Sequence, residues 1–389
     1  MSGNKVQFAN TLRGFAALSV IVAHYFGVFW MVRPAVSTLI NAPVLPLNEY
    51  AVPNYIALVN SYPLFNFGAF GVALFFIISG FVIPFSLEKI SGFSFLVNRV
   101  FRIFPTYFFG FSVTLLAVYL STYYFGGVWP YTNGEVAIHY FPGLRDILWS
   151  KDIDGIVWAL EVELKFYLVC AVFSVLIRRG SRAVFIAPLL IALACVLVSG
   201  QLEALGATNA DLYLKALAYI VYPAKYLVFM FIGVAFHYVN SGRMTYPVGY
   251  FTVGVLFTVF AALWYSGPTS SSFYLVWSYA AALLVFSFAY AFPSLFKSNR
   301  VFDFFANISY PLYVVHGVTG YVALRILLDL GVKAWVSLII VTLSVFLLSW
   351  LIHKAIETPA QRVGKWTVKY LTEGPTKKPR EVSTARVRV

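Results

Sequence analysis

Two ionisable residues in the first long apolar stretch could do chemistry together. Arg13 and His24 are separated by ten residues, which in an α-helix places them about 16 Å apart along the axis but only about 20° apart around it. A guanidinium group stays charged and matches phosphate oxygens in geometry. An imidazole titrates near neutrality and can act as a general base. The spacing therefore predicts an anion-binding group and a proton acceptor along one face of a helix.

Further ionisable residues within apolar stretches extend this pattern into two layers. The layer near the cytoplasmic rim is predicted to hold Arg13, Arg99 and Arg102. The other layer, about three helical turns further outward, is predicted to hold His24, Glu163 and His316. Ionisable groups at membrane depth are costly and must face the bundle interior or a water-filled cavity. Both layers are therefore expected to line a common interior space.

This arrangement suits a long anionic donor that enters from the cytoplasm. Coenzyme A has its phosphates at one end and its thioester at the end of a flexible arm. Groups that hold the phosphates and a base for acyl transfer would then be separated by much of a membrane leaflet. Acyl-CoA is the expected co-substrate, and neither a permanently bound cofactor nor a metal ion is expected.

The composition is that of an integral membrane protein. Of the 389 residues, 60% are hydrophobic and 11% charged, and the mean hydropathy is +0.80, whereas a soluble domain carries about 25% charged residues. The net charge of +13 resides in short hydrophilic gaps and the C-terminal segment, as is typical of cytoplasmic anchors. Nucleic-acid binding is therefore not expected. Cys170 and Cys195 both lie within apolar runs, which indicates buried thiols rather than a disulfide or a metal pair.

About ten apolar stretches are long enough to cross a hydrocarbon core of roughly 30 Å, which takes about 20 helical residues. They are residues 12–32, 67–87, 101–125, 156–177, 183–199, 216–239, 246–265, 273–292, 304–328 and 334–352. The sequence therefore predicts an all-α polytopic membrane protein. Pro311 lies within the ninth stretch and cannot donate a helical hydrogen bond to residue 307, which predicts a kink just before His316.

The distribution of Lys and Arg predicts the orientation, because cytoplasmic gaps are enriched in them. Only five of the 28 lie in the gaps on one side, at Arg33, Arg145, Lys151, Lys215 and Lys333. Both chain ends are therefore expected in the cytoplasm. Residues 1–355 are predicted to form the membrane-embedded domain, and residues 356–389 a disordered basic tail near anionic lipid.

Several of these residues also have a purely structural interpretation. The arginines could be membrane anchors, and either histidine could join helices by hydrogen bonds. Glu161 and Lys165 are four residues apart and are expected to pair locally, whereas Lys225 could bind substrate or pair with a glutamate. In an outer loop, Asp152 and Asp154 are expected to be solvated, with contact to a sugar or a cation as the alternative.

Five motifs, in this order along the chain, resemble those of the acyltransferase 3 family. The first, LRGFAALSVIVAHYF, contains Arg13 and His24, and the second, FGVALFFIISGFVI, contains Ser79. NRVFRIFPTY supplies Arg99 and Arg102, WALEVELKFY supplies Trp158, Glu163 and Tyr167, and ISYPLYVVH supplies Tyr313 and His316. Each motif is weak alone in an apolar sequence, but the five together are specific.

The resemblance implies a membrane O-acyltransferase that moves an acyl group, acetyl by default, from cytoplasmic acyl-CoA to a hydroxyl of a cell-surface or lipid-linked carbohydrate. It implies His24, Glu163 and His316 as catalytic residues, Arg13, Arg99, Arg102 and Ser79 as donor-binding residues, and Trp158, Tyr167 and Tyr313 as acceptor-binding residues. The expected location is the plasma membrane, the inner membrane of a bacterium, and the oligomeric state stays open. A transporter or flippase for an anionic or glycosylated lipid is the main alternative. A glycosyltransferase that uses Asp152 and Asp154 is a lesser one.

Overall fold

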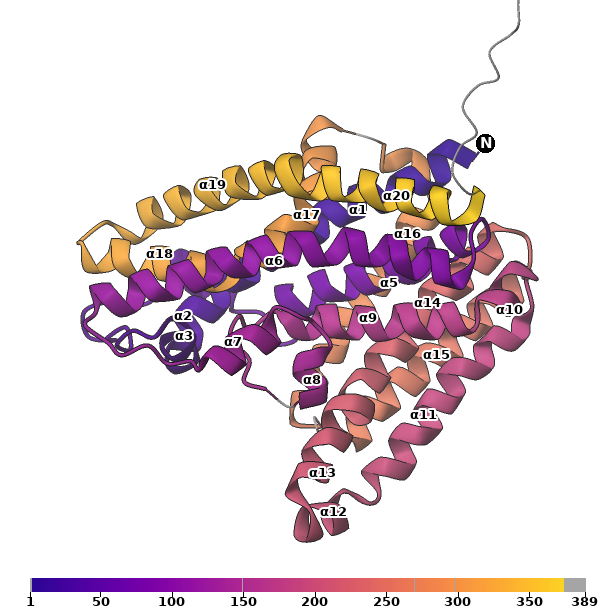
Figure 1. Ribbon diagram of the computed structural model, residues 1–389, viewed down its shortest axis with the longest axis horizontal. Coiled ribbons are helices and arrows are strands. Elements are labelled where there is room, and N and C mark those ends of the chain that lie inside the picture. Colours follow the sequence, from indigo (N-terminus) through magenta and orange to yellow (C-terminus); the bar gives the residue numbers. More distant parts are fainter. Residues whose placement is uncertain (1, 149, 269, 298, 374–389) are drawn as a thin grey trace, which may run out of the picture.

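The computed structural model describes residues 2–148, 150–268, 270–297 and 299–373 (Figure 1). In these residues all regular secondary structure is helical, and loops join the helices. In chain order the α-helices are α1 (Ser2–Val22), α2 (Phe29–Met31), α3 (Arg33–Ile40), α4 (Asn54–Val59), α5 (Phe67–Leu87), α6 (Gly92–Tyr124), α7 (Asn133–His139), α8 (Leu144–Leu148), α9 (Val157–Val172), α10 (Ser174–Arg178), α11 (Ile186–Ser199), α12 (Leu202–Thr208), α13 (Ala210–Ala216), α14 (Tyr222–Asn240), α15 (Tyr246–Ser266), α16 (Val276–Ala291), α17 (Arg300–Val315), α18 (Gly317–Asp329), α19 (Ala334–Ile352) and α20 (Thr358–Glu373). Turns of 3₁₀ helix (Arg182–Phe185, Ser270–Leu275, Pro293–Leu295) and π-helical segments (Ala23–Val28, Leu217–Val221, His353–Glu357) join several of them. The predicted all-α class is confirmed.

Eight helical segments of the described residues are long and apolar enough to cross a membrane, and a ninth is added if α17 and α18 form one bent span. They are Gln7–Met31, Phe67–Leu87, Gly92–Tyr124, Arg182–Ser199, Ala210–Asn240, Tyr246–Ser266, Ser270–Ala291 and Ala334–Thr372. This arrangement is that of a polytopic membrane protein. The predicted count of about ten spans is not confirmed.

The segment predicted as a span over residues 156–177 is shorter than expected. Helix α9 has 16 residues, about 24 Å of rise, and the chain turns at Phe173 before the short α10. By itself this helix is shorter than the about 20 residues that a hydrocarbon core of about 30 Å takes. Helix α9 is therefore a shorter element within the bundle, and it carries Glu163.

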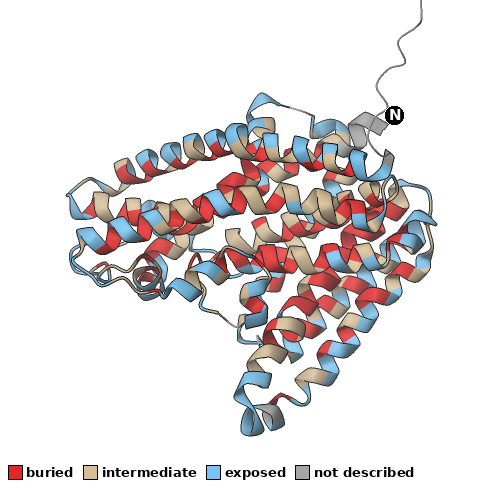
Figure 2. Cartoon of the chain, in the orientation of Figure 1, coloured by how far each residue is buried: buried red, intermediate tan, exposed pale blue. Residues whose placement is uncertain are grey.

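The outward faces of the long helices are apolar, as lipid contact requires. Figure 2 shows exposed residues along the outside of α19 and α6 and buried residues between the helices. The exposed side chains include Leu116 and Leu120 of α6 and Leu343 and Leu347 of α19. Helix α14 is the most enclosed, because every residue from Leu227 to Tyr238 is buried.

Two helices extend beyond their predicted ends. Helix α6 begins at Gly92, where the Ser91 hydroxyl accepts a hydrogen bond from the backbone N–H of Ser94 (3.1 Å). Arg99 and Arg102 therefore lie well inside a helix and not at its start. The sequence also predicts disorder from residue 356, whereas α20 is helical.

Helix α20 is ordered because it packs on α6. A Cβ at Gly364 would lie 2.7 Å from Cβ of Phe101, and Val368 is buried. The predicted disorder is therefore wrong for residues 358–373, and residues 374–389 lie outside the described residues. In Figure 1, α20 and the N-terminus lie at the same end of the long axis, as expected if both face one side of a membrane.

The predicted kink near His316 is confirmed and is sharp. Helices α17 and α18 meet at 72°, with His316 as the residue between them. Pro311 lies one turn earlier in α17 and removes one helical hydrogen bond there.

The packing of α5 against α14 depends on glycine. A Cβ at Gly80 would lie 1.9 Å from the carbonyl oxygen of Met230, and one at Gly233 would lie 2.2 Å from the carbonyl oxygen of Ile77. The backbones are therefore in direct contact, and this contact fixes Ser79 next to α9.

We expect Gly233→Ala to lower the thermal unfolding midpoint of the purified protein by several degrees. The added methyl group must push α5 and α14 apart, and overpacking of this kind costs about 1–3 kcal/mol. Gly254→Ala is the matched control, because Gly254 lies exposed on α15 and a Cβ added there would meet nothing within 4 Å. The control should keep or raise the midpoint, since Ala favours helix over Gly. Equal midpoints for the two variants would contradict the close contact of α5 and α14.

Candidate functional site

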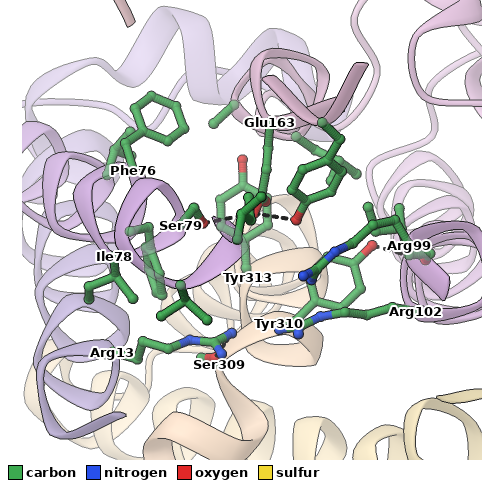
Figure 3. Close-up of a pocket in the computed structure, with 18 residues that line it drawn as sticks. Arg13, Phe76, Ile78, Ser79, Arg99, Arg102, Glu163, Ser309, Tyr310 and Tyr313 are labelled. Carbon is green, nitrogen blue, oxygen red and sulfur yellow. Dashed lines mark hydrogen bonds between the residues drawn. The ribbon is translucent and has the colours of Figure 1, made fainter. Parts of the chain in front are cut away.

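A cavity between α1, α5, α6, α9 and α17 brings together the predicted arginines. Its empty volume is about 900 Å³, and its charged lining residues are Arg13, Arg99, Arg102 and Glu163. We call this cavity the arginine pocket. Figure 3 shows Arg13 reaching in from one side and Arg99 and Arg102 from the opposite side, with their guanidinium groups directed toward one space. With all four groups ionised, the pocket holds an excess of two positive charges.

Two of the arginines are held in place by defined contacts. The guanidinium of Arg13 donates a hydrogen bond to the hydroxyl of Ser309 on α17 (3.3 Å). The guanidinium carbon of Arg99 lies 4.9 Å from the ring centre of Phe95 and 5.0 Å from that of Tyr167, within the range of cation–π attraction. Such contacts orient the side chains before a ligand binds.

Glu163 belongs to the arginine pocket and not to the histidines. Its carboxylate accepts hydrogen bonds from the hydroxyls of Ser79 (2.9 Å) and Tyr167. The sequence places Glu163 at the depth of His24, whereas the structure places it in one pocket with the arginines. Glu163 therefore does not belong to the predicted layer with the two histidines. Ser79 lines the same pocket and donates its hydrogen bond to the Glu163 carboxylate.

The two predicted histidines meet beyond the arginine pocket. The ring centroids of His24 and His316 lie 4.5 Å apart, with the rings nearly perpendicular at 87°. His24 stands in the π-helical segment Ala23–Val28, and its Nδ1 hydrogen-bonds the hydroxyl of Tyr321. The segment that follows α1 and the junction of α17 and α18 therefore bring the two imidazoles together.

The backbone fixes the tautomer of His316. Its Nδ1 lies 3.0 Å from the carbonyl oxygen of Leu312 and 2.8 Å from that of Tyr313. Carbonyl oxygens only accept hydrogen bonds, so Nδ1 carries the proton. In the neutral ring, Nε2 then presents its lone pair. This atom is buried and has no hydrogen-bond partner among the described residues, which leaves it available to accept a proton.

A second, smaller cavity lies next to the arginine pocket, on the side of His316. It has an empty volume of about 170 Å³, and we call it the apolar neck. Phe75, Ser309 and Tyr313 line both cavities, and His316 lines the neck. The other lining residues of the neck are Ala17, Val20, Ile21 and Leu312. A cationic pocket, an apolar passage and an imidazole thus follow one another along α1 and α17.

The predicted acceptor-binding residues separate into two groups. Tyr167 and Tyr313 line the arginine pocket, and the hydroxyl of Tyr313 also donates a hydrogen bond to the carbonyl of Ile156. Trp158 is not among the lining residues of either cavity; it is 36% exposed, and its ring packs against Tyr226 at 5.4 Å. Trp158 therefore lies outside both cavities, and its predicted contact with an acceptor stays a prediction.

Charged residues of the outer segments form ion pairs other than those predicted from the sequence. Glu161 forms an ion pair with Arg145, and Lys165 forms one with Asp146, so the local pair of Glu161 and Lys165 is wrong. Both partners come from α8, which lies beside α9. Lys225 is buried, with its ammonium 4.2 Å from the ring centre of Trp264.

The two outer aspartates are also more enclosed than expected. Asp154 is 3% exposed, and it accepts a hydrogen bond from the Tyr107 hydroxyl (2.8 Å). Its predicted solvation is therefore wrong. The outer loop folds inward here because Asp154 caps the start of α9 through the backbone N–H groups of Ile156 and Val157.

Tyr321 is a site residue that the sequence did not indicate. It lies five residues after His316, in a helix that points in a different direction from α17. No periodicity continues through a bend of 72°, so a contact from α18 back to His24 leaves no signal in the spacing.

Comparison with known proteins identifies the family of the chain. The family model described as an acyltransferase domain matches residues 6–354. Nodulation protein 10 of Rhizobium leguminosarum bv. viciae is 34% identical over 133 residues, which cover 30% of this chain and 36% of that protein. The chain thus aligns with little more than a third of the relative. No solved structure matches the chain. Because the family match extends over nearly the whole helical bundle, the protein belongs to the acyltransferase 3 family of membrane acyltransferases.

Proposed function

We propose that the protein transfers an acyl group, acetyl by default, from cytoplasmic acyl-CoA to a hydroxyl of a cell-surface or lipid-linked carbohydrate in a bacterial inner membrane. The proposal rests on the order in which the arginine pocket, the apolar neck and the histidine pair follow one another. This order along α1 and α17 matches the order of phosphates, flexible arm and thioester in coenzyme A.

The arginine pocket is proposed as the site of the coenzyme A phosphates. Guanidinium groups bind phosphate through charge-assisted hydrogen bonds. Arg13, Arg99 and Arg102 converge from two helices on one space, and Glu163 offsets part of their charge. An excess of positive charge remains, so an anion is the ligand that the pocket favours.

The histidine pair is proposed as the site of acyl transfer. In a direct route, an imidazole nitrogen takes the proton of the acceptor hydroxyl while the hydroxyl oxygen bonds to the thioester carbonyl carbon. The carbon–sulfur bond then breaks, and the coenzyme A sulfur leaves with the electron pair and takes the proton from the imidazolium. In a two-step route, His24 first accepts the acyl group and then passes it to the hydroxyl.

The two imidazoles offer different atoms to this chemistry. The tautomer of His316 is fixed, with the proton on Nδ1 and the lone pair on Nε2. His316 is therefore suited to take a proton. His24 is oriented by Tyr321 and lies edge to face with His316. We therefore propose that His24 acts on the acceptor or the acyl group, with His316 beside it as a second base.

We expect His24→Ala to lower acceptor-dependent release of coenzyme A by about 10²- to 10⁴-fold, the usual contribution of a general base. Binding of acyl-CoA should change little, since His24 does not line the arginine pocket. Free thiol release by the purified protein and calorimetric binding of coenzyme A measure the two quantities. His353→Asn is the control, because His353 pairs with Glu357 and lines neither cavity. Wild-type turnover in His24→Ala would sink the mechanism. Substrate movement across liposomes without thiol release would favour a flippase.

Arg13→Ala should weaken coenzyme A binding at least tenfold, because it removes a charged donor to phosphate. The variant should lose part of its binding of 3′,5′-adenosine diphosphate too, since that fragment carries phosphates but no thioester arm. Arg179→Ala serves as the control, because Arg179 is exposed and lies outside the pocket. Unchanged coenzyme A affinity in Arg13→Ala would overturn the phosphate role.

Glu163→Gln should strengthen coenzyme A binding by about two- to tenfold. The change removes a negative charge next to three arginines and keeps a hydrogen-bond acceptor for Ser79 and Tyr167, and an electrostatic gain of this size is expected for a partly buried charge. If Glu163 were instead the base that deprotonates the acceptor, turnover would fall by a factor of about 10² or more at unchanged donor affinity. Measurement of turnover and coenzyme A affinity in the same variant decides between the two roles.

A further inference from the structure

His139, Asp152 and Asp154 form a cluster on the side of α9 where its N-terminus lies, with His139 and Asp154 buried and Asp152 partly buried. None of the three lines either cavity. One ligand atom from each of the three lies within 4.8 Å of the others. His139 ends α7, and the aspartates stand in the loop that leads into α9. The sequence predicts no metal site, because twelve residues lie between His139 and Asp152 and only the fold joins them.

The histidine is the unusual member of the cluster. His139 is fully buried, with 0% of its side chain exposed, and neither ring nitrogen has a hydrogen-bond partner among the described residues. Its Nε2 faces the cluster and lies 3.4 Å from Oδ2 of Asp154, a long contact that is an ion pair only if the imidazole is protonated. A buried polar group without a partner is costly, so the geometry indicates a ligand between the histidine and the carboxylates.

The carboxylates are held in place by other groups. Asp154 accepts from the backbone N–H of Ile156 (3.0 Å) and Val157 (2.9 Å) through Oδ1, and from Tyr107 through Oδ2. Asp152 accepts from the backbone N–H of Gly155 (2.9 Å), which has a φ of +68°. Hydrogen bonds that orient metal ligands in this way are a regular feature of metal sites.

The charge of the cluster also calls for a cation. Within the described ranges, no Lys or Arg forms an ion pair with Asp152 or Asp154, since Arg145 and Lys165 pair with Glu161 and Asp146. Two carboxylates together in a largely buried place repel each other unless a positive charge lies between them. One imidazole nitrogen and two carboxylate oxygens form a ligand set that zinc accepts, whereas calcium and magnesium prefer oxygen alone.

We propose that His139, Asp152 and Asp154 bind a structural zinc ion. The ion would join the end of α7 to the start of α9. It would also fix the loop behind the histidine pair, because a Cβ at Gly317 would meet Ile156 at 3.3 Å and the backbone oxygen of Asp154 at 3.5 Å. The site thus supports the bend at His316 from the outer side.

The experiment is a zinc titration of the full chain, purified without a polyhistidine tag and stripped with a chelator. Wild type should take up about one zinc per chain, measured by mass spectrometry after desalting, and its thermal unfolding midpoint should rise as zinc is added. Asp152→Asn should lower the zinc affinity at least tenfold. Tyr107→Phe keeps all three ligands and should lower it by about 10- to 100-fold through loss of a bond to a ligand, so it tests the site even if Asp152→Asn folds poorly.

Asp211→Asn is the matched control, because it removes an exposed carboxylate that pairs with Lys215. Its zinc content and midpoint should follow those of wild type. The proposal is overturned if wild type takes up no zinc and shows no shift in its midpoint, which would make the cluster an ion pair of a protonated His139 with Asp154. It is equally overturned if Asp152→Asn and Tyr107→Phe bind zinc as wild type does.

Discussion

The 72° bend at His316 is the constraint on which the rest of the site depends. At this bend the backbone breaks its helical pattern, and the Tyr25 hydroxyl donates a hydrogen bond to the carbonyl of His316 (2.9 Å). Tyr25 reaches that carbonyl only because residue 320 is glycine, where a Cβ would lie 2.2 Å from the tyrosine oxygen. The bend turns α18 back toward α1, so Tyr321 contacts His24. A straight helix would separate the two imidazoles from this tyrosine.

Helix α17 also takes part in two environments that the proposed reaction needs to keep apart. It contributes Ser309 to the arginine pocket, whose lining carries the charged groups. Nearer the bend, at the end of the same helix, the backbone carbonyls of Leu312 and Tyr313 hold the His316 proton on Nδ1. One helix therefore presents an anion-binding surface and, about two turns later, a basic nitrogen.

The sequence predicted those features that depend on one helix or on the cost of burying charge. Arg13, Arg99 and Arg102 share a pocket because lipid excludes all three from other positions, and Pro311 indicated the bend because its effect is local. The features that depend on packing between helices were not predictable. Glu163 was misplaced because its depth was inferred from the ends of an apolar stretch, whereas its neighbours follow from the packing of α9 against α5 and α6.

Similar reasons apply to the outer segments. Glu161 and Lys165 stand four residues apart and satisfy a helical pairing rule, yet α8 supplies stronger partners from outside the helix. Trp158 belongs to a motif that resembles those of the family, but a motif gives no direction for its side chains. Asp154 was expected in water because loops are usually hydrated, whereas its capping of α9 draws it into the protein.

The apolar neck explains how a base and a thioester could meet without loss of the acyl group to water. A general base next to a thioester activates any water molecule as readily as an acceptor hydroxyl. His316 is fully buried, and apart from Ser309, Tyr313 and His316 itself the residues that line the neck are apolar. Water inside such a narrow passage would find few hydrogen-bond partners, and dry cavities of this kind exclude it. A bound acceptor would then hold its hydroxyl beside the imidazoles, where water finds no stable place. Acyl transfer would therefore be favoured over hydrolysis.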